Sequence, residues 1–197
     1  MELQVPPHTL FQKKTADGII HNRIFMDDFI HSGEDLHEIL NTLHESESKD
    51  TLEVRINSSG GYARYGQQFI NVMNDRFRGR SMTVIEAEAL SIAALIFIAG
   101  DIRVVYPHSN LLFHDVSLSL GEGKASEAIA RLKIVHNTFF DYMVQMLSPY
   151  FSKKEIKDIS NGLDISLDAY QMCERGIATT VLTANGKISA SEYLETF

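Results

Sequence analysis

The chain has little of what secreted or nucleic-acid-binding proteins need. Its one cysteine, Cys173, cannot form a disulfide within the chain, whereas small secreted domains usually depend on several. Acidic residues outnumber lysine and arginine by 26 to 18, for a formal net charge of −8. No long basic run offers an electrostatic footprint for nucleic acid. We therefore expect a reducing, cytoplasmic setting and no nucleic-acid partner.

Long apolar segments are also missing. The longest run, Ile92 to Ala99, has eight residues, far short of the roughly twenty that span a bilayer. The start of the chain contains Pro6 and Pro7 but no basic stretch followed by the apolar core of a secretory signal. The sequence predicts a soluble protein with no membrane partner.

Strand patterns alternate with helical patterns along most of the 197 residues. Such alternation predicts an α/β fold, and the length suits one well-buried domain. The predicted strands are Ile19–Met26, Leu52–Ile56, Met82–Glu86, Ile102–Tyr106, Leu111–His114 and Ile177–Leu182. Helices are predicted around Leu36–Leu43, Tyr65–Phe77, Ser91–Ala99, Lys124–Leu147 and Leu167–Arg175, and after Ser152. Gly100 occupies the usual position of a helix-terminating glycine.

Ser91 stands out because it is a lone hydroxyl at the head of an apolar, helix-forming run. A hydroxyl nucleophile needs a base and a group that orients the base. His114, at the end of a predicted strand, and Asp164, after an Asn-Gly pair, supply these residue types. The order Ser, His, Asp favours a hydrolase. Capping is the ordinary role of a serine at a helix start, so Ser91 taken alone leaves both interpretations open.

Other residues compete for the roles of base and acid. His108, in a predicted turn, and His136, on the long helix, are the nearest alternative bases. Asp115 directly follows His114, but adjacent strand residues point to opposite faces, so its side chain is poorly placed to orient that ring. Asp168 is the rival acid, although an early-turn helix charge has an electrostatic explanation of its own.

Four motifs in chain order resemble the Clp protease proteolytic subunit, a serine peptidase of family S14. They are a polar glycine turn, a serine opening a helix, a histidine ending an apolar strand and an aspartate before Gly176. The motifs are Asn57–Gly61, Ala89–Ala93, Asn110–His114 and Asp164. The resemblance covers roughly Leu52 to Leu182. It implies a crotonase-like stack of repeated βαβ units with a long protruding handle helix from about Lys124. Residues 1–197 would form one peptidase domain, with a divergent N-terminal segment 1–18 and a C-terminal tail 183–197.

The resemblance also implies a role for each site residue. Ser91 would be the nucleophile, His114 the general base and Asp164 the orienting acid. The backbone N–H groups of Gly61 and Ile92 would form the oxyanion hole, because a Gly-Gly turn lets main chain approach the reacting carbonyl. An extended peptide would be held in strand-like fashion by Gly60, Tyr62, Val116, Ser117 and Leu118. No metal or organic cofactor is implied, and the sequence lacks the phosphate-binding loop of ATPases.

Some positions depart from the family pattern around the substrate groove. Ser59 stands where the family usually has proline, and Ala93 where it has glycine. Ala87–Glu88 replaces a Gly-Gln pair, and Asp115–Val116 replaces Gln-Pro after the histidine. The three triad positions keep the family's residue types.

The leading hypothesis is a Clp-type serine endopeptidase that hydrolyses peptide bonds of unfolded polypeptides in an oligomeric chamber. The resemblance implies a homo-oligomer of stacked heptameric rings, with an AAA+ unfoldase as the candidate partner that uses ATP. Three alternatives stay open: a phage-type Clp-like head maturation protease, a non-catalytic ClpP-like assembly subunit, and a crotonase-type acyl-CoA enzyme. The last would not require Ser91.

Overall fold

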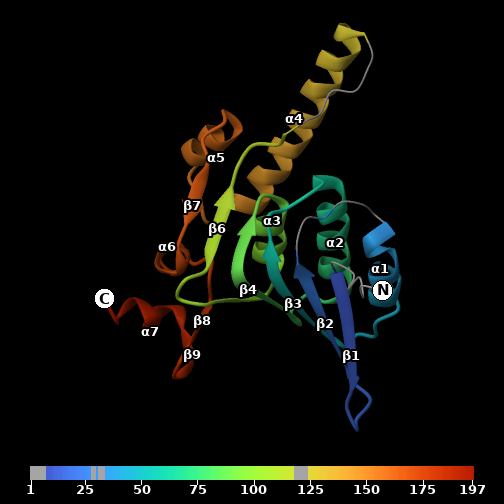
Figure 1. The fold of residues 1–197 in the computed structure, drawn as a ribbon, viewed down its shortest axis with the longest axis vertical. Coiled ribbons are helices and arrows are strands. Elements are labelled where there is room, and N and C mark those ends of the chain that lie inside the picture. The colour runs from blue at the N-terminus through green and yellow to red at the C-terminus, as the bar shows by residue number, and fades with distance from the viewer. Residues whose placement is uncertain (1–7, 28–29, 31–33, 118–123) are drawn as a thin grey trace, which may run out of the picture. The chain divides into compact units, whose positions relative to one another are not determined.

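The computed structural model describes residues 8–27, 30, 34–117 and 124–197 (Figure 1). The chain divides into two compact units, one made of Met1–Leu112 with Ser166–Phe197 and the other of Phe113–Ile165.

A mostly parallel β-sheet forms the centre of the first unit. Its strands are β1 (His8–Lys14), β2 (Ile20–Asp27), β3 (Thr51–Ser58), β4 (Ser81–Leu90), β5 (Ile102–Val105), β6 (Asn110–Phe113), β7 (Ile165–Leu167), β8 (Thr180–Thr183) and β9 (Gly186–Ser189). The main path follows the order β1-β2-β3-β4-β5-β8-β9, with β6 pairing β4 and β7. Neighbours from β2 to β8 along this path run parallel, whereas β1 and β9 pair antiparallel at its ends.

Strand β4 is long enough to serve two neighbours in succession. Its first part, Met82–Ile85, pairs with β5, and its last part, Glu88–Leu90, pairs with β6. The pairing with β3 shifts register between Ile56 and Ser58. The carboxyl end of β4 therefore leaves the main path and continues beside β6.

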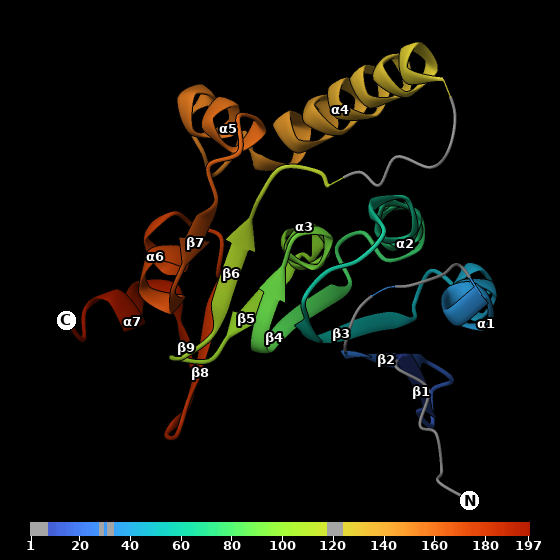
Figure 2. The ribbon, with the colours of Figure 1, turned by 45° about the horizontal axis from the view of Figure 1, so that its top comes forward.

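Helices α1 (Glu34–His44), α2 (Ala63–Arg76) and α3 (Ile92–Ala99) lie on one side of strands β2, β3 and β4, as Figure 2 shows. The helix predicted around Leu36–Leu43 is confirmed as α1, and its apolar side chains Leu36, Ile39, Leu40 and Leu43 are at most 5% exposed. Helix α3 is buried from Ile92 to Ile98, as expected of a helix that is apolar on every side. Short helices α6 (Ala169–Glu174) and α7 (Ala190–Leu194) belong to the C-terminal part of the same unit.

The second unit contains the long helix α4 (Ala125–Leu147) and the short helix α5 (Lys153–Ser160). The helix predicted after Ser152 is confirmed and begins with a capping box, in which the Glu155 amide donates to the Ser152 hydroxyl and the Glu155 carboxylate accepts from the Ser152 amide. Phe113 and Phe151 pack edge to face with ring centroids 5.3 Å apart. Within the described ranges, no helix is long and apolar enough to cross a membrane.

The alternation of strands and helices confirms a mixed α/β architecture around a central sheet, but some local expectations were wrong. Strand β1 was not predicted, and Leu167 ends strand β7 instead of opening a helix. Asp168 is the N-cap of α6, where its side chain accepts from the amide of Gln171. Gly100 does end α3, as expected, but its φ of −68° is one that any residue can adopt. A β-carbon there would lie 2.4 Å from Thr83 Oγ1, so the position requires glycine for close packing.

Candidate active site

The carboxyl ends of β3 and β4 bring two of the sequence motifs together. The Gly60–Gly61 turn follows β3, and Ser91 stands between β4 and α3. In sheets with parallel strands, ligand sites lie characteristically at this edge.

Ser91 has a strained backbone, with φ 59° and ψ −125°. It is the one non-glycine residue with positive φ within the described part of the chain. Such conformations cost about 1–3 kcal/mol and persist where surrounding contacts enforce them. Here the Ser91 amide donates to the Leu112 carbonyl at 2.9 Å, and the Ser91 carbonyl accepts from Ala94 at 3.1 Å. The geometry is that of a sharp strand-to-helix elbow, which presents a side chain at the edge of a sheet.

The Ser91 hydroxyl does not cap the helix that it precedes. Ser91 is the N-cap residue of α3, yet its side chain makes no capping hydrogen bond. An ordinary capping serine would accept a bond from an amide in the first turn. The capping interpretation of Ser91, left open by the sequence, therefore does not explain this side chain.

The glycine turn packs directly on Ser91. A β-carbon on Gly60, whose φ is +107°, would lie 2.7 Å from Ser91 Cβ and 3.3 Å from its Oγ. Gly61, with φ +147°, would place a β-carbon 2.5 Å from the Ile30 carbonyl oxygen. The turn is pinned there because Ile30 donates to the Gly60 carbonyl at 2.8 Å and Tyr62 donates to the Ile30 carbonyl at 3.0 Å. Both glycines are required by conformation and by space.

Two main-chain amides beside Ser91 are available for an anion. Among the described residues, neither the Gly61 nor the Ile92 amide donates to a protein acceptor. Ile92 is the first residue of α3, where the helix dipole adds partial positive charge. These are the two donors that the sequence predicts for an oxyanion. The Tyr62 amide, in contrast, is occupied by Ile30, while the Tyr62 side chain is 54% exposed.

His114 belongs to the second unit, where its ring meets the main chain of Asp115. The His114 Nδ1 atom lies 2.5 Å from the Asp115 main-chain oxygen. A carbonyl only accepts, so Nδ1 is the donor in this contact. Strand alternation bears on the Asp115 side chain, whereas the contact with His114 comes from the Asp115 main chain.

The Asp115 side chain is itself anchored within the second unit. Its Oδ1 atom accepts from the Val116 amide at 2.7 Å, and its Oδ2 atom lies 3.7 Å from His136 Nε2. The same His136 nitrogen lies 3.3 Å from the Ser160 carbonyl oxygen. His136 thus joins α4 to both α5 and the segment that follows His114, a link with no signal in the sequence.

Asp164 is exposed, and no hydrogen bond or ion pair joins it to His114 within the described ranges. Of the residues predicted to hold a peptide, Val116 is half-buried and Ser117 exposed. Leu118 lies outside the described residues. The rival acid, Asp168, is occupied as the cap of α6.

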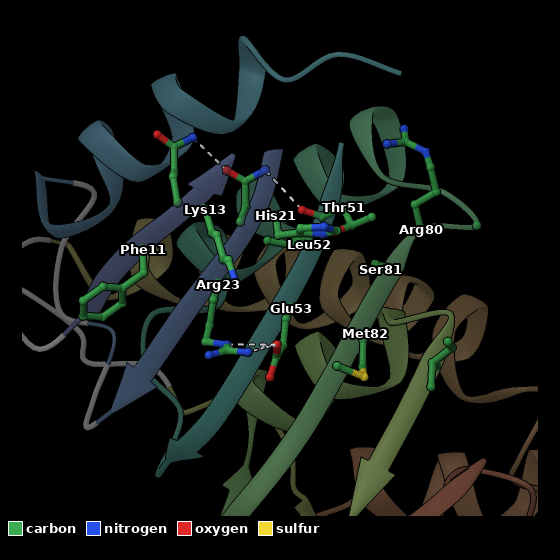
Figure 3. Close-up of a pocket in the computed structure, with 14 residues that line it drawn as sticks. Phe11, Lys13, His21, Arg23, Thr51, Leu52, Glu53, Arg80, Ser81 and Met82 are labelled. Atoms are coloured by element: carbon green, nitrogen blue, oxygen red, sulfur yellow. Dashed lines mark hydrogen bonds and ion pairs between the residues drawn. The ribbon is translucent and has the colours of Figure 1, made fainter. Parts of the chain in front are cut away.

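A separate groove of about 640 Å³ lies at the opposite end of the sheet. Figure 3 shows it along the amino-terminal parts of β2, β3 and β4, where Arg23 and Glu53 pair at 2.9 Å. Neither Ser91 nor the glycine turn lines it. At about 3.3 Å per residue, the strands separate the two regions by roughly 20 Å. The groove therefore takes no part in the chemistry at Ser91.

Within the described ranges, neither the cysteine nor a cluster of metal-ligating side chains supplies a second reactive centre. Burial, reinforced by the charge of Asp168, raises the pKa of the Cys173 thiol to about 11, so it is a poor nucleophile at neutral pH. In the part of the chain that the structure describes, no group of three or more His, Cys, Asp or Glu side chains is arranged to hold a metal ion.

The chain matches the family model described as Clp protease over residues 15–185. A search of curated proteins returns no significant match. The family match extends across nearly all of the elements described above, including the elbow at Ser91 and the glycine turn that packs on it. The chain therefore belongs to the Clp protease family and is a ClpP-like peptidase.

Proposed function

We propose that the protein is a serine endopeptidase that hydrolyses polypeptides through Ser91, His114 and Asp164. The observation that carries the proposal is the strained backbone of Ser91, whose hydroxyl makes no capping bond. Strain of this kind is retained at functional sites, where it holds a side chain in a reactive position. The nearby Gly61 and Ile92 amides support the same assignment.

Each group has a defined role in the reaction. His114 Nε2 takes the proton from Ser91 Oγ as the oxygen attacks the substrate carbonyl carbon. The Gly61 and Ile92 amides stabilise the resulting oxyanion. His114 then gives its proton to the departing amine as the peptide bond breaks, which leaves an acyl-enzyme on Ser91. Water, deprotonated by His114, releases the acyl group.

Chain connectivity favours His114 as the base. His114 follows Leu112 by two residues, and the Leu112 carbonyl accepts the Ser91 amide. Asp164 would take the place of the Asp115 carbonyl at Nδ1 in the working enzyme, where a carboxylate stabilises the imidazolium that forms. Catalytic hydrogen bonds often form only in the substrate complex, so their absence in the free chain is compatible with this role.

The finer features of the family belong to the same proposal. Residues 1–197 would act as one crotonase-like peptidase domain, and the protein would work in the cytoplasm. Helix α4, which exposes Ile129 at 53% and Ile134 at 67%, would be the handle through which two heptameric rings stack. Exposed apolar side chains of this kind are typical of interfaces. An AAA+ unfoldase would deliver unfolded polypeptides to the chamber.

The decisive experiment is labelling with a fluorophosphonate probe, which reacts with activated serines. We expect stoichiometric labelling that maps to Ser91 by mass spectrometry and disappears in Ser91→Ala. The exposed Ser191 provides a matched control, because Ser191→Ala should label as the wild type does. A chain that binds no probe would instead be a non-catalytic assembly subunit or a crotonase-type enzyme. Native mass spectrometry tests the chamber, and a monomer at micromolar concentration would exclude it.

A further inference from the structure

An arginine is clamped between two tyrosines immediately after the glycine turn. The Arg64 guanidinium carbon lies 4.6 Å from the ring centroid of Tyr65 and 5.8 Å from that of Tyr62. Arg64 Nη2 also donates to the Tyr65 hydroxyl at 2.8 Å. The two rings meet edge to face at 6.1 Å. The guanidinium is thus held in place although Arg64 is exposed to solvent.

The same short segment packs on Ser91 at one end and on the next residue, Ile92, at the other. Before the arginine, Gly60 lies against Ser91, and after it a β-carbon on Gly66 would lie 2.2 Å from Ile92 Cγ1. Arg64 is two residues before Gly66 and on a different face of α2, because residues two apart on a helix do not face each other. Its position three residues after Gly61, with its guanidinium beside the Tyr62 ring, puts the arginine at the rim of the site that contains Ser91 and the Gly61 amide.

Folding does not account for a cation at this position. The first turn of α2 has no acidic residue, and its N-cap, Tyr62, makes no side-chain capping bond. Among the described residues, no carboxylate pairs with Arg64. A positive charge in the first turn opposes the helix dipole. Proteins tend to break local rules of this kind at functional sites.

We propose that Arg64 determines substrate specificity by binding a carboxylate of the polypeptide close to the bond that is cut. This inference rests on the proposed function of Ser91 and names the substrate class. The planar guanidinium binds a carboxylate through two parallel hydrogen bonds, and the tyrosine rings hold that plane fixed. The carboxylate belongs to an acidic side chain, and the substrates are polypeptides rich in Asp or Glu around the cleaved bond.

The test compares fluorogenic peptides with blocked termini that differ only by Glu or Gln beside the scissile bond. We expect the wild type to cleave the Glu peptide about tenfold more efficiently in kcat/KM, as for a hydrogen bond to a charged group. Arg64→Gln should remove the preference, and Arg64→Glu should reverse it toward a Lys peptide. Arg78→Gln is the matched control, since Arg78 lies just beyond the other end of α2 and its loss should leave the preference intact.

Two further measurements keep the outcome clear. The first compares a Gln peptide that has a free C-terminal carboxylate with the same peptide as a C-terminal amide. If the enzyme prefers the free carboxylate here but shows no preference for Glu over Gln, the assignment to an acidic side chain is wrong. If an Arg64 variant fails to fold, the wild-type Glu preference must still fall with added salt, and a preference unchanged by salt would contradict the proposal. If the fluorophosphonate probe labels Ser91 but the enzyme does not prefer the Glu peptide, this inference is wrong and the proposed function stands. If the probe does not label Ser91, the proposed function is wrong as well.

Discussion

Gly60 lies so close to Ser91 that a β-carbon on the glycine would be 2.7 Å from the serine β-carbon. The turn after β3 and the elbow after β4 are therefore one packed unit. The residue that would carry the nucleophile and the loop that would bind the oxyanion cannot move independently, which suits electrostatic stabilisation by preorganised donors.

Gly60→Ala should disable the site by displacing Ser91. The new methyl group would also meet the Leu90 carbonyl oxygen at 2.8 Å, in a backbone with φ +107°. We expect the fluorophosphonate labelling rate to fall by at least about a hundredfold, the scale of losing one oxyanion donor. Gly79→Ala is the control, because Gly79 has φ +77° but open space around it. Equal labelling of the two variants would show that contact with Ser91 is unimportant.

Ser91→Gly should be more stable than Ser91→Ala, although neither variant reacts. Glycine adopts a φ of 59° without strain, which should raise the free energy of unfolding by about 1–3 kcal/mol. Its unfolded chain is more flexible than that of alanine, which should lower the free energy of unfolding by roughly 0.5–1 kcal/mol. We expect the free energy of unfolding of Ser91→Gly to exceed that of Ser91→Ala by about 1 kcal/mol, the surplus of these two effects. Urea denaturation measures the difference, and an alanine variant as stable as the glycine variant would argue against strain.

Acid should weaken the contact between Ser81 and Asp101. Burial raises the pKa of the Asp101 carboxyl, but bonds from the Ser81 hydroxyl and from main-chain amides outweigh it, so the pKa is lowered overall. A lowered pKa stabilises the fold above the ordinary value near 4 and loses that effect as the pH falls through the folded value. Asp101→Asn should therefore cost about 1 kcal/mol at pH 7 and progressively less below pH ~4.

Urea denaturation of this variant at pH 7, 4 and 3 checks the direction of the Asp101 effect. Asp141→Asn, an exposed aspartate on α4, serves as its control and should change stability little at any pH. A difference between wild type and Asp101→Asn that grows toward acid would contradict the assignment.

The thiol of Cys173 should react slowly in the folded protein. With a pKa of about 11, roughly one thiol in a thousand is ionised at pH 8, against about a quarter for an ordinary cysteine. We expect alkylation by iodoacetamide to be at least about a hundredfold slower than in urea. Intact mass spectrometry follows the reaction directly because the chain has a single cysteine. Rapid alkylation of the native protein would mean that this part of the core opens readily.

The spacing of apolar residues predicted most of the helices and strands, because the buried face of an element is formed by residues close together in the sequence. The helix α1 and the strand around Val54 both follow from local spacing. Strand β1 escaped prediction because its residues show no clear alternation, and pairing with β2 decides its conformation. The same holds for Gly100, whose role depends on Thr83, seventeen positions earlier in the sequence.

The sequence by itself determined the alternation of strands and helices, and it placed a serine, a histidine and an aspartate in the order found in a serine hydrolase. Only the tertiary structure decided that Ser91 adopts a strained elbow, because that conformation is enforced by Leu112 and Gly60 from two other strand ends. It also decided that the Asp115 carbonyl meets His114 Nδ1. Local spacing reports which face of an element is buried, whereas backbone strain and close contacts arise between segments that only the folded chain brings together.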